Sequence, residues 1–234
     1  MTNNRIWELD ALRGLCIIGM VAVHAVYDAV ELYGLIRWNY PPAFLIVKDW
    51  GAVVFLLLSG TSATLGSRSV RRGLIVLGCG LAITAVTVAG ALLGLVDGGM
   101  TILFGILHCL GCCMILWHFF RRLSGKWLTG LGTILVAAGF LAGRVTVPFP
   151  WLIPLGLLPA HFSSADFFPL LPNLGYFLLG AALGRKLYPL RQTRFPNAAA
   201  SPISRFFQVC GRHSLTIYML HQPVLLLVLA CFGS

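Results

Sequence analysis

The fold is decided by the first long apolar run of the chain, LRGLCIIGMVAVHAVYDAVELYGL, which extends from Leu12 to Leu35. A helix needs about 20 mostly apolar residues to cross the hydrocarbon core of a bilayer, and this run is long enough. Because lipid offers the backbone no hydrogen-bond partner, such a segment must satisfy its own amides as a helix. The run therefore predicts a transmembrane helix, and its interior contains ionisable residues that lipid disfavours, among them His24 and Asp28.

The rest of the chain has the same character as this run. Of its 234 residues, 58% are hydrophobic and only 10% are charged, and the mean hydropathy is +0.88. A soluble domain has about 25% charged residues, so this composition excludes a soluble or disordered protein. The 17 Lys and Arg residues stand between apolar runs rather than on one face, which argues against a nucleic-acid partner. Membrane lipid is the expected surrounding.

Seven apolar runs are long enough to span a bilayer, and they predict an all-α, polytopic membrane helix bundle that forms a single domain over residues 1–234. The alternating pattern of outer-membrane barrel strands is missing from them. The predicted spans are Leu12–Leu35, Phe44–Gly66, Val70–Leu95, Thr101–Phe120, Trp127–Gly143, Phe167–Leu187 and Ser214–Phe232.

The positive charges between these spans predict the orientation of the chain. One side has 14 Lys and Arg residues and the other side has three, which are Arg37, Lys48 and Arg144. By the positive-inside rule the richer side is cytoplasmic. We therefore predict a cytoplasmic N-terminus, an external C-terminus and a multi-pass location in a bacterial inner membrane.

The first predicted span has the clearest candidate for chemistry. Counted from Leu9 at about 1.5 Å per residue, His24 lies roughly 22 Å above the inner end of the helix. Asp28 follows on the same helix face, where it could orient the imidazole or stabilise its protonated form. The alternative is a buried histidine that bonds a backbone carbonyl, with Asp28 simply at the membrane interface.

Other polar residues approach from other predicted spans. His108 and Asn173 are expected roughly 10 Å and 9 Å below the outer surface, where they could meet His24. His221, with Gln222 beside it, is expected only roughly 12 Å from the inner surface, so below His24. The alternative for His108 and His221 is a hydrogen bond that holds two helices together.

Arginines on the cytoplasmic side form a second candidate site. Together they could line an opening that binds a phosphate-bearing ligand, and the residues concerned are Arg13, Arg72, Arg185 and Arg212. Asp10 stands three residues before Arg13, so an ion pair within the helix is the alternative for that arginine.

Metal binding is the weaker interpretation of the same side chains. The three histidines with Asp28 offer ligands, but nothing in their spacing fixes a coordination geometry. The cysteines at 109, 112 and 113 share a helix face, where small residues also let helices approach closely. No metal is expected.

The motifs resemble a known family. They are, in order, Arg5-x4-Asp10-Ala-Leu-Arg13-Gly14, Met20-Val-Ala-Val-His24-x3-Asp28, Phe55-x3-Ser59-Gly60, Phe104-Gly-Ile-Leu-His108, Phe168-Pro-Leu-Leu-Pro-Asn173, and Gly211-Arg-His-Ser-Leu-x-Ile-Tyr-x-Leu-His221-Gln-Pro223. They are similar to the bacterial DUF1624 membrane proteins and to the catalytic domain of heparan-α-glucosaminide N-acetyltransferase, within the YeiB-like and acyltransferase-3 superfamily. The spacing Arg13-x10-His24 resembles the acyltransferase-3 motif that contains the proposed catalytic base.

This resemblance implies transmembrane acyl transfer. Acetyl-CoA or another acyl-CoA would enter from the cytoplasm, and an amine or hydroxyl of a small molecule or glycan would accept the acyl group outside. His24 with Asp28 and His108 would be catalytic, and the arginines would bind the CoA. Substrate contacts would come from Asn173, His221, Gln222, Ser59 and Trp38. Trp38 follows Leu35, near the position where heparan-α-glucosaminide N-acetyltransferase, a lysosomal enzyme, has its catalytic histidine.

Three alternatives to this interpretation stay open. An acyl-histidine intermediate could replace direct transfer. A small proton-coupled permease would use the intramembrane histidines and Asp28 as a proton relay. A scaffold without chemistry would leave them as packing contacts, and a homo-oligomer is compatible with each of these functions.

Overall fold

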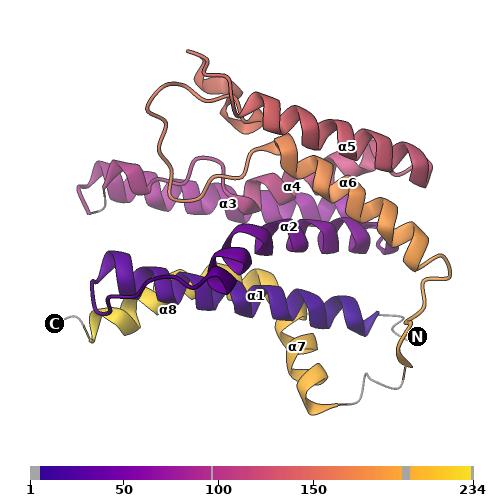
Figure 1. The fold of residues 1–234 in the computed structure, drawn as a ribbon, viewed down its shortest axis with the longest axis horizontal. Helices are drawn as coiled ribbons and strands as arrows, with labels where there is room; N and C mark the ends of the chain where they lie inside the picture. The colour runs from indigo at the N-terminus through magenta and orange to yellow at the C-terminus, as the bar shows by residue number, and fades with distance from the viewer. Residues whose placement is uncertain (1–5, 96, 197–200, 233–234) are drawn as a thin grey trace. The chain divides into compact units, whose positions relative to one another are not determined.

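The computed structural model describes residues 6–95, 97–196 and 201–232, which form helices joined by loops (Figure 1). Arg5, the first residue of the quoted motifs, lies outside the described residues. The chain packs as two compact units, residues 1–58 with 190–234, and residues 59–189. Helix α2, Pro42–Leu65, begins in the first unit and ends in the second. A single domain over residues 1–234 stays a prediction.

The first unit is built around α1, Trp7–Tyr27, which continues into a π-helical turn, η1, Asp28–Leu32. Its partners are two helices from the end of the chain, α7, Pro202–Arg212, and α8, Ser214–Ala230. Helix α1 packs most extensively on α7 and also contacts α8. The two ends of the chain therefore make one unit.

The start of α1 is held by polar contacts to residues that precede α7. The buried carboxylate of Glu8 accepts hydrogen bonds from the Thr193 hydroxyl at 2.7 Å and the Arg194 amide at 2.8 Å. The Trp7 indole donates to the Phe195 carbonyl at 2.9 Å. An acidic side chain is favourable in the first turn of a helix, where the helix dipole is positive. These contacts fix the first turn of α1.

Helices α1 and α7 cross through a pair of glycines. A Cβ atom on Gly14 would collide with the backbone carbonyl of Phe207, and one on Gly211 would collide with the carbonyl of Asp10. Glycine lets the two backbones approach this closely, as in other membrane helix pairs. The crossing therefore places the first polar turn of α1 beside the end of α7.

The second unit contains two packed helix pairs. Helix α3, Ser69–Leu92, packs on α4, Ile106–Phe120, and α5, Gly125–Ala142, packs on α6, Leu170–Leu187. The loops include two 3-10 turns, Gly98–Met100 and Pro150–Leu155. Its largest fully buried side chains are Phe177, Leu128, Leu178, Cys109 and Cys113.

Two predicted spans of this unit are shorter than expected. Phe104 and Phe167 form an isolated β-bridge, and the Phe168 amide donates to the Phe104 carbonyl at 2.9 Å. The Asp166 carboxylate also accepts from the Ile106 amide at the start of α4, at 3.0 Å. Because these backbone groups bond each other, the predicted spans Thr101–Phe120 and Phe167–Leu187 lose their first residues to extended structure.

The expectation of seven spans is therefore wrong as a count of long apolar helices. Within the described residues, four helical segments are long and apolar enough to cross a membrane: Trp7–Leu32, Pro42–Leu65, Ser69–Leu92 and Gly125–Ala142. A fifth exists if α7 and α8, which meet at an angle of 82°, count as one broken span. The fold class, a polytopic helical membrane protein, is confirmed. The orientation of the termini stays a prediction.

Candidate functional site

His24 on α1 lies directly against His221 on α8. The Nδ1 atom of His24 is 2.8 Å from the Nε2 atom of His221, and the ring centroids are 4.9 Å apart. His221 is buried, whereas His24 keeps part of its surface accessible. The first unit thus contains a hydrogen-bonded histidine pair with one ring that remains accessible.

The contact of His221 with its own helix assigns the protons of this pair. Its Nδ1 atom is 2.5 Å from the Tyr218 carbonyl oxygen, which can only accept, so Nδ1 of His221 is protonated. In the neutral ring, Nε2 of His221 is then an acceptor, and Nδ1 of His24 must donate to it. The remaining nitrogen, Nε2 of His24, therefore carries the lone pair and is the basic atom of the pair.

Asp28 and Gln222 form a second contact beside the histidines. Asp28 is 4% exposed, and its Oδ2 atom accepts a hydrogen bond from Nε2 of Gln222 at 2.8 Å. Gln222 also shares a side-chain hydrogen bond with the His24 ring. One turn further out, the Tyr33 hydroxyl donates to the Leu226 carbonyl at 3.1 Å. These contacts attach the outer part of α1 and the π-helical turn to α8.

The geometry differs from the expected arrangement in two respects. The hydrogen bond that orients the His24 ring is the one that it donates to His221, and Asp28 affects His24 through its charge and through Gln222. His221 is also level with His24 rather than below it. The depth of His24 in the membrane stays a prediction.

His108 belongs to the second unit and has partners for both ring nitrogens. The Thr84 hydroxyl donates to the Ile102 carbonyl at 2.6 Å, so its oxygen accepts from Nε2 of His108 at 3.2 Å. Nδ1 of His108 accepts from the Gly105 amide at 3.2 Å. The ring is 3% exposed. This geometry is that of a residue that caps α4 and ties it to α3.

Asn173 and Ser59 also lie in the second unit. Asn173 is buried near the start of α6 and donates to the Pro169 carbonyl at 2.7 Å. Ser59 is partly buried within α2. His24 belongs to the first unit. The expected approach of His108 and Asn173 to His24 therefore stays a prediction.

Trp38 lies in the first unit, in an aromatic cluster between η1 and α2. Its ring centroid is 6.0 Å from that of Tyr40 and 5.6 Å from that of Phe44, and it is 42% exposed. The Tyr40 hydroxyl donates to the Glu31 carboxylate at 3.0 Å. Desolvation and this carboxylate raise the pKa of Tyr40, so the phenol stays protonated over the physiological range.

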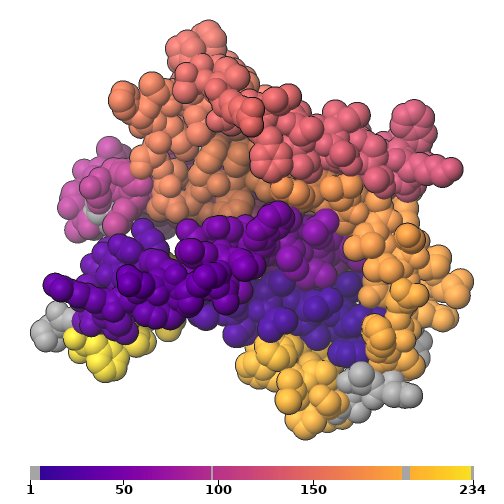
Figure 2. All heavy atoms as spheres, viewed as in Figure 1, coloured from indigo at the N-terminus to yellow at the C-terminus, as the bar shows by residue number. Residues whose placement is uncertain are grey.

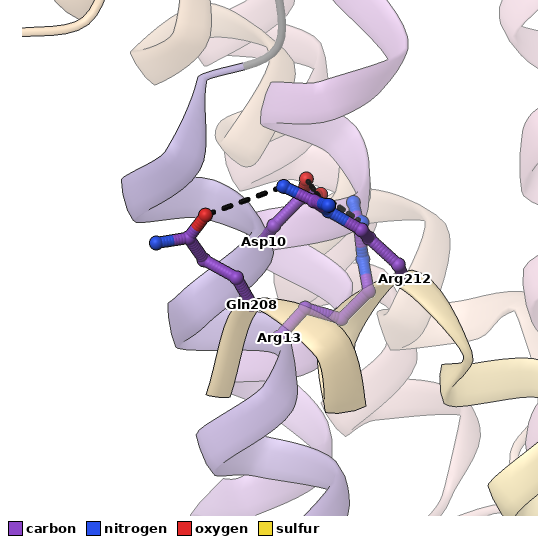
Figure 3. A network of polar contacts seen from close by, with 4 residues as sticks. All are labelled: Asp10, Arg13, Gln208 and Arg212. Carbon is purple, nitrogen blue, oxygen red and sulfur yellow. Dashed lines mark hydrogen bonds and ion pairs between the residues drawn. The ribbon is translucent and has the colours of Figure 1, made fainter. Parts of the chain in front are cut away.

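Two of the four predicted CoA-binding arginines converge on one carboxylate (Figure 3). Arg13 and Arg212 lie 3.3 Å and 3.6 Å from the two carboxylate oxygens of Asp10. Arg212 also donates to the Gln208 side chain at 3.3 Å. The side chain of Asp10 is only 13% exposed. The cluster therefore holds two positive charges and one negative charge beside the start of α1.

The other two arginines lie in the second unit. Arg185 donates to the carbonyls of Leu123 and Arg121, which follow the end of α4, and its guanidinium lies 5.7 Å from the centroid of the Trp117 ring. These contacts satisfy carbonyl groups that a helix end leaves open. Arg72 is exposed near the start of α3. Arg185 therefore has a structural task that the sequence did not indicate.

Sequence reasoning missed the hydrogen-bond partners that set the protons of the buried histidines. The Tyr218 carbonyl, the Gly105 amide and the Thr84 hydroxyl assign the protons of the two buried histidines. Only the spacing of three residues between Tyr218 and His221, and between Gly105 and His108, could have indicated such local contacts.

Within the part of the chain that the structure describes, no group of three or more His, Cys, Asp or Glu side chains could hold a metal ion.

Comparison with known proteins gives one match. A family model described as heparan-alpha-glucosaminide N-acetyltransferase, catalytic, matches residues 5–223. No curated protein and no solved structure matches the chain. The matched range includes the histidine pair, Asp28, Gln222 and all four arginines.

Proposed function

Because the chain belongs to the family of the heparan-alpha-glucosaminide N-acetyltransferase catalytic domain, we propose that it transfers an acyl group from cytoplasmic acyl-CoA to an external acceptor. Family membership makes it a membrane protein with a transferase function of the acetyltransferase type. The finer parts of the proposal are the acyl-CoA donor, the sugar-like amine or hydroxyl acceptor, the histidine base and the bacterial inner membrane.

The observation that carries the proposal is the basic nitrogen of His24. The hydrogen bond to His221 holds the ring in one orientation and leaves the lone pair on Nε2. A general base must present such a lone pair to the proton that it removes. Asp28, one turn away and buried, supplies a negative charge that stabilises the imidazolium formed when His24 takes a proton.

In the proposed reaction His24 both takes and returns the transferred proton. The acceptor amine or hydroxyl attacks the thioester carbonyl as Nε2 of His24 takes its proton, and the carbon–sulfur bond then breaks. The CoA thiolate leaves with the electron pair of that bond and receives the proton from His24. General base catalysis of this kind contributes about 10² to 10⁴ in rate.

The donor would bind at the arginine cluster of the first unit. Arg13 and Arg212 exceed the charge of Asp10 by one positive charge, and guanidinium groups bind phosphate oxygens through paired hydrogen bonds. A phosphate group of CoA would compete with Asp10 for these donors. The thioester end would then extend along α1 towards His24.

A proton-coupled permease is the second candidate, because a chain of hydrogen-bonded histidines is also what a proton relay requires. Acyl-CoA binding separates the two functions. A ligand present at 100 times its dissociation constant stabilises the folded state by about 2.7 kcal/mol, which is measurable as a rise in Tm. A permease has no reason to respond.

The test measures the binding and the turnover of acetyl-CoA by the purified protein in lipid nanodiscs. We expect acetyl-CoA to raise Tm, and we expect Arg13→Ala to reduce the rise while Arg144→Ala, on the predicted external side, leaves it intact. We also expect release of the free CoA thiol when amino sugars or alcohols are added. No rise in Tm and no thiol release with any acceptor would contradict the proposal.

A further inference from the structure

Helix α7 has an apolar face that points away from its packing partner. Ile203, Phe206 and Val209 are 72%, 56% and 54% exposed, and their spacing of three residues aligns them along the helix. The side of α7 that contacts α1 contains the buried Gln208 and Gly211. In the space-filling view α7 lies at the surface of the first unit (Figure 2). The helix is therefore amphipathic with its apolar side open.

Arginines border this apolar face. Arg205 and Arg212 are seven residues apart, so they lie on the same side of the helix, between the apolar face and the face that packs on α1. Arg212 is engaged with Asp10 and Gln208. Arg205 is exposed. An apolar face bordered by arginine is the pattern of helices that lie in the interface of an anionic membrane.

The depth of α7 follows from its crossing with α1. The two helices meet at Gly14, and a rise of about 1.5 Å per residue gives about 27 Å from Gly14 to Leu32 at the end of the span. This length is close to the hydrocarbon thickness of about 30 Å. When Leu32 is at the outer boundary, Gly14 and the α7 crossing are therefore at the inner boundary.

The direction of α7 agrees with this depth. It meets α8 at an angle of 82°. If α8 crosses the bilayer, α7 must run nearly parallel to the membrane surface. A helix parallel to the surface, at the boundary of the hydrocarbon, has its apolar face among the acyl chains close to the headgroups.

We propose that α7 is an interfacial helix that inserts Ile203, Phe206 and Val209 into the cytoplasmic leaflet and binds anionic phospholipid headgroups through Arg205. The lipid contact holds the glycine crossing at the level of the headgroups. It thereby sets the height of α1 in the membrane and keeps the Asp10, Arg13 and Arg212 cluster at the cytoplasmic surface. The inference does not depend on acyl transfer.

The test compares two neighbouring residues on different sides of α7, whose rings touch at a centroid distance of 5.3 Å. A photoreactive benzoylphenylalanine replaces Phe206 in one variant and Phe207, whose backbone carbonyl meets Gly14, in the other. Both full-length proteins are irradiated in nanodiscs of phosphatidylglycerol and phosphatidylcholine, and adducts are identified by mass spectrometry. We expect phospholipid adducts at position 206 and crosslinks to α1 at position 207.

Other results at position 206 would overturn the proposal. A crosslink to residues 59–189 would show that the second unit covers α7, and a crosslinked dimer would show that a second copy covers it. Absence of adducts, with α1 crosslinks intact at position 207, would show that the face is in water. If the Phe206 variant does not fold, benzoylphenylalanine at Ile203 tests the same apolar face.

The charge of Arg205 is tested in the same nanodiscs. One arginine near a membrane surface enriches anionic lipid about fivefold. In the Phe206 crosslinking variant, Arg205→Gln should therefore lower the ratio of phosphatidylglycerol to phosphatidylcholine adducts about fivefold, whereas Arg122→Gln on the second unit should not change it. An unchanged ratio in Arg205→Gln would overturn the assignment of anionic headgroups to this residue.

Discussion

The two units each contain a buried polar site with a histidine, and the two sites are built differently. In the second unit, His108 accepts from the Gly105 amide and donates to the Thr84 hydroxyl, so both nitrogens serve the backbone and the neighbouring helix. In the first unit, His24 donates to His221, which in turn donates to the Tyr218 carbonyl. His24 keeps its basic Nε2 on a partly accessible ring beside Gln222, whereas Nδ1 of the buried His108 already accepts from the Gly105 amide.

This difference teaches how to separate chemistry from packing among histidines in lipid. Both residues interrupt apolar helices, so hydropathy alone ranks them equally. The protons distinguish them, because a nitrogen whose lone pair already accepts a buried hydrogen bond is not available to take a proton from a substrate. We therefore assign the base to His24 and a capping role to His108, and the substitutions below test that contrast.

Replacing the proposed base should have the largest effect on turnover. His24→Ala should lower acyl-CoA turnover by about 10² to 10⁴, because the proton acceptor is lost. The change leaves His221 without one partner and costs about 1 to 3 kcal/mol, so the helix bundle should survive. Elution volume and Tm establish that the variant is folded. If this variant turned over acyl-CoA as fast as the parent, His24 would not be the base.

Removing the partner of His24 should have the next largest effect. His221→Phe keeps an aromatic ring but deletes the acceptor that orients His24, and a lost hydrogen bond of about 1.4 kcal/mol lowers the rate about tenfold. His221→Gln retains an oxygen that can accept from Nδ1 of His24, so it should recover part of the loss. The pH profile of turnover should also change in His221→Phe. Equal rates in the parent and both variants would contradict the role of His221.

Neutralising Asp28 should cost less again. Asp28→Asn retains an oxygen for the Gln222 hydrogen bond, so the fold is preserved, but the charge that stabilises the His24 imidazolium is lost. We expect turnover about twofold to fivefold lower, in line with a single charge one helical turn away. Turnover assays on folded protein at fixed salt measure it. A loss as large as that of His24→Ala would instead make Asp28 a direct participant.

His108→Ala should lower stability and leave turnover unchanged, which is the reverse of the effect expected for His24→Ala. Turnover per folded molecule should be unchanged, while the free energy of unfolding should fall by about 1 to 3 kcal/mol because the Gly105 amide and the Thr84 hydroxyl lose their partner. Thermal unfolding and turnover are measured on the same preparation. A large loss of turnover with Tm unchanged would place His108 in the chemistry and remove the contrast between the units.

The sequence predicts much of this site and little of its contacts. His24, Asp28, His221 and Gln222 could be identified because ionisable and amide side chains are costly in apolar helices. Their contacts could not, since depth counted along α1 does not reveal where α7 crosses it. The proton positions depend on the Tyr218 carbonyl, which only the spacing of three residues between Tyr218 and His221 could have indicated.

The fold was predicted in class but not in detail, for related reasons. Windows of about 20 apolar residues identify long spans such as Pro42–Leu65, but they overlook α7, whose arginines and serines make it appear to be a loop. The pattern that identifies α7 is the spacing of Ile203, Phe206 and Val209 over a shorter length. The shortened start of α4 follows from backbone pairing between Phe104 and Phe167, which hydropathy does not register.

The most direct test of the account is the protonation of His24 itself. Solid-state ¹⁵N NMR of histidine-labelled protein in lipid distinguishes a protonated ring nitrogen from one with a lone pair, and the signal missing from His24→Ala assigns the ring. The account predicts, near neutral pH, a proton on Nδ1 of His24 and the lone pair on Nε2, with this tautomer lost in His221→Phe. A ring protonated on Nε2 with the lone pair on Nδ1 would contradict the account.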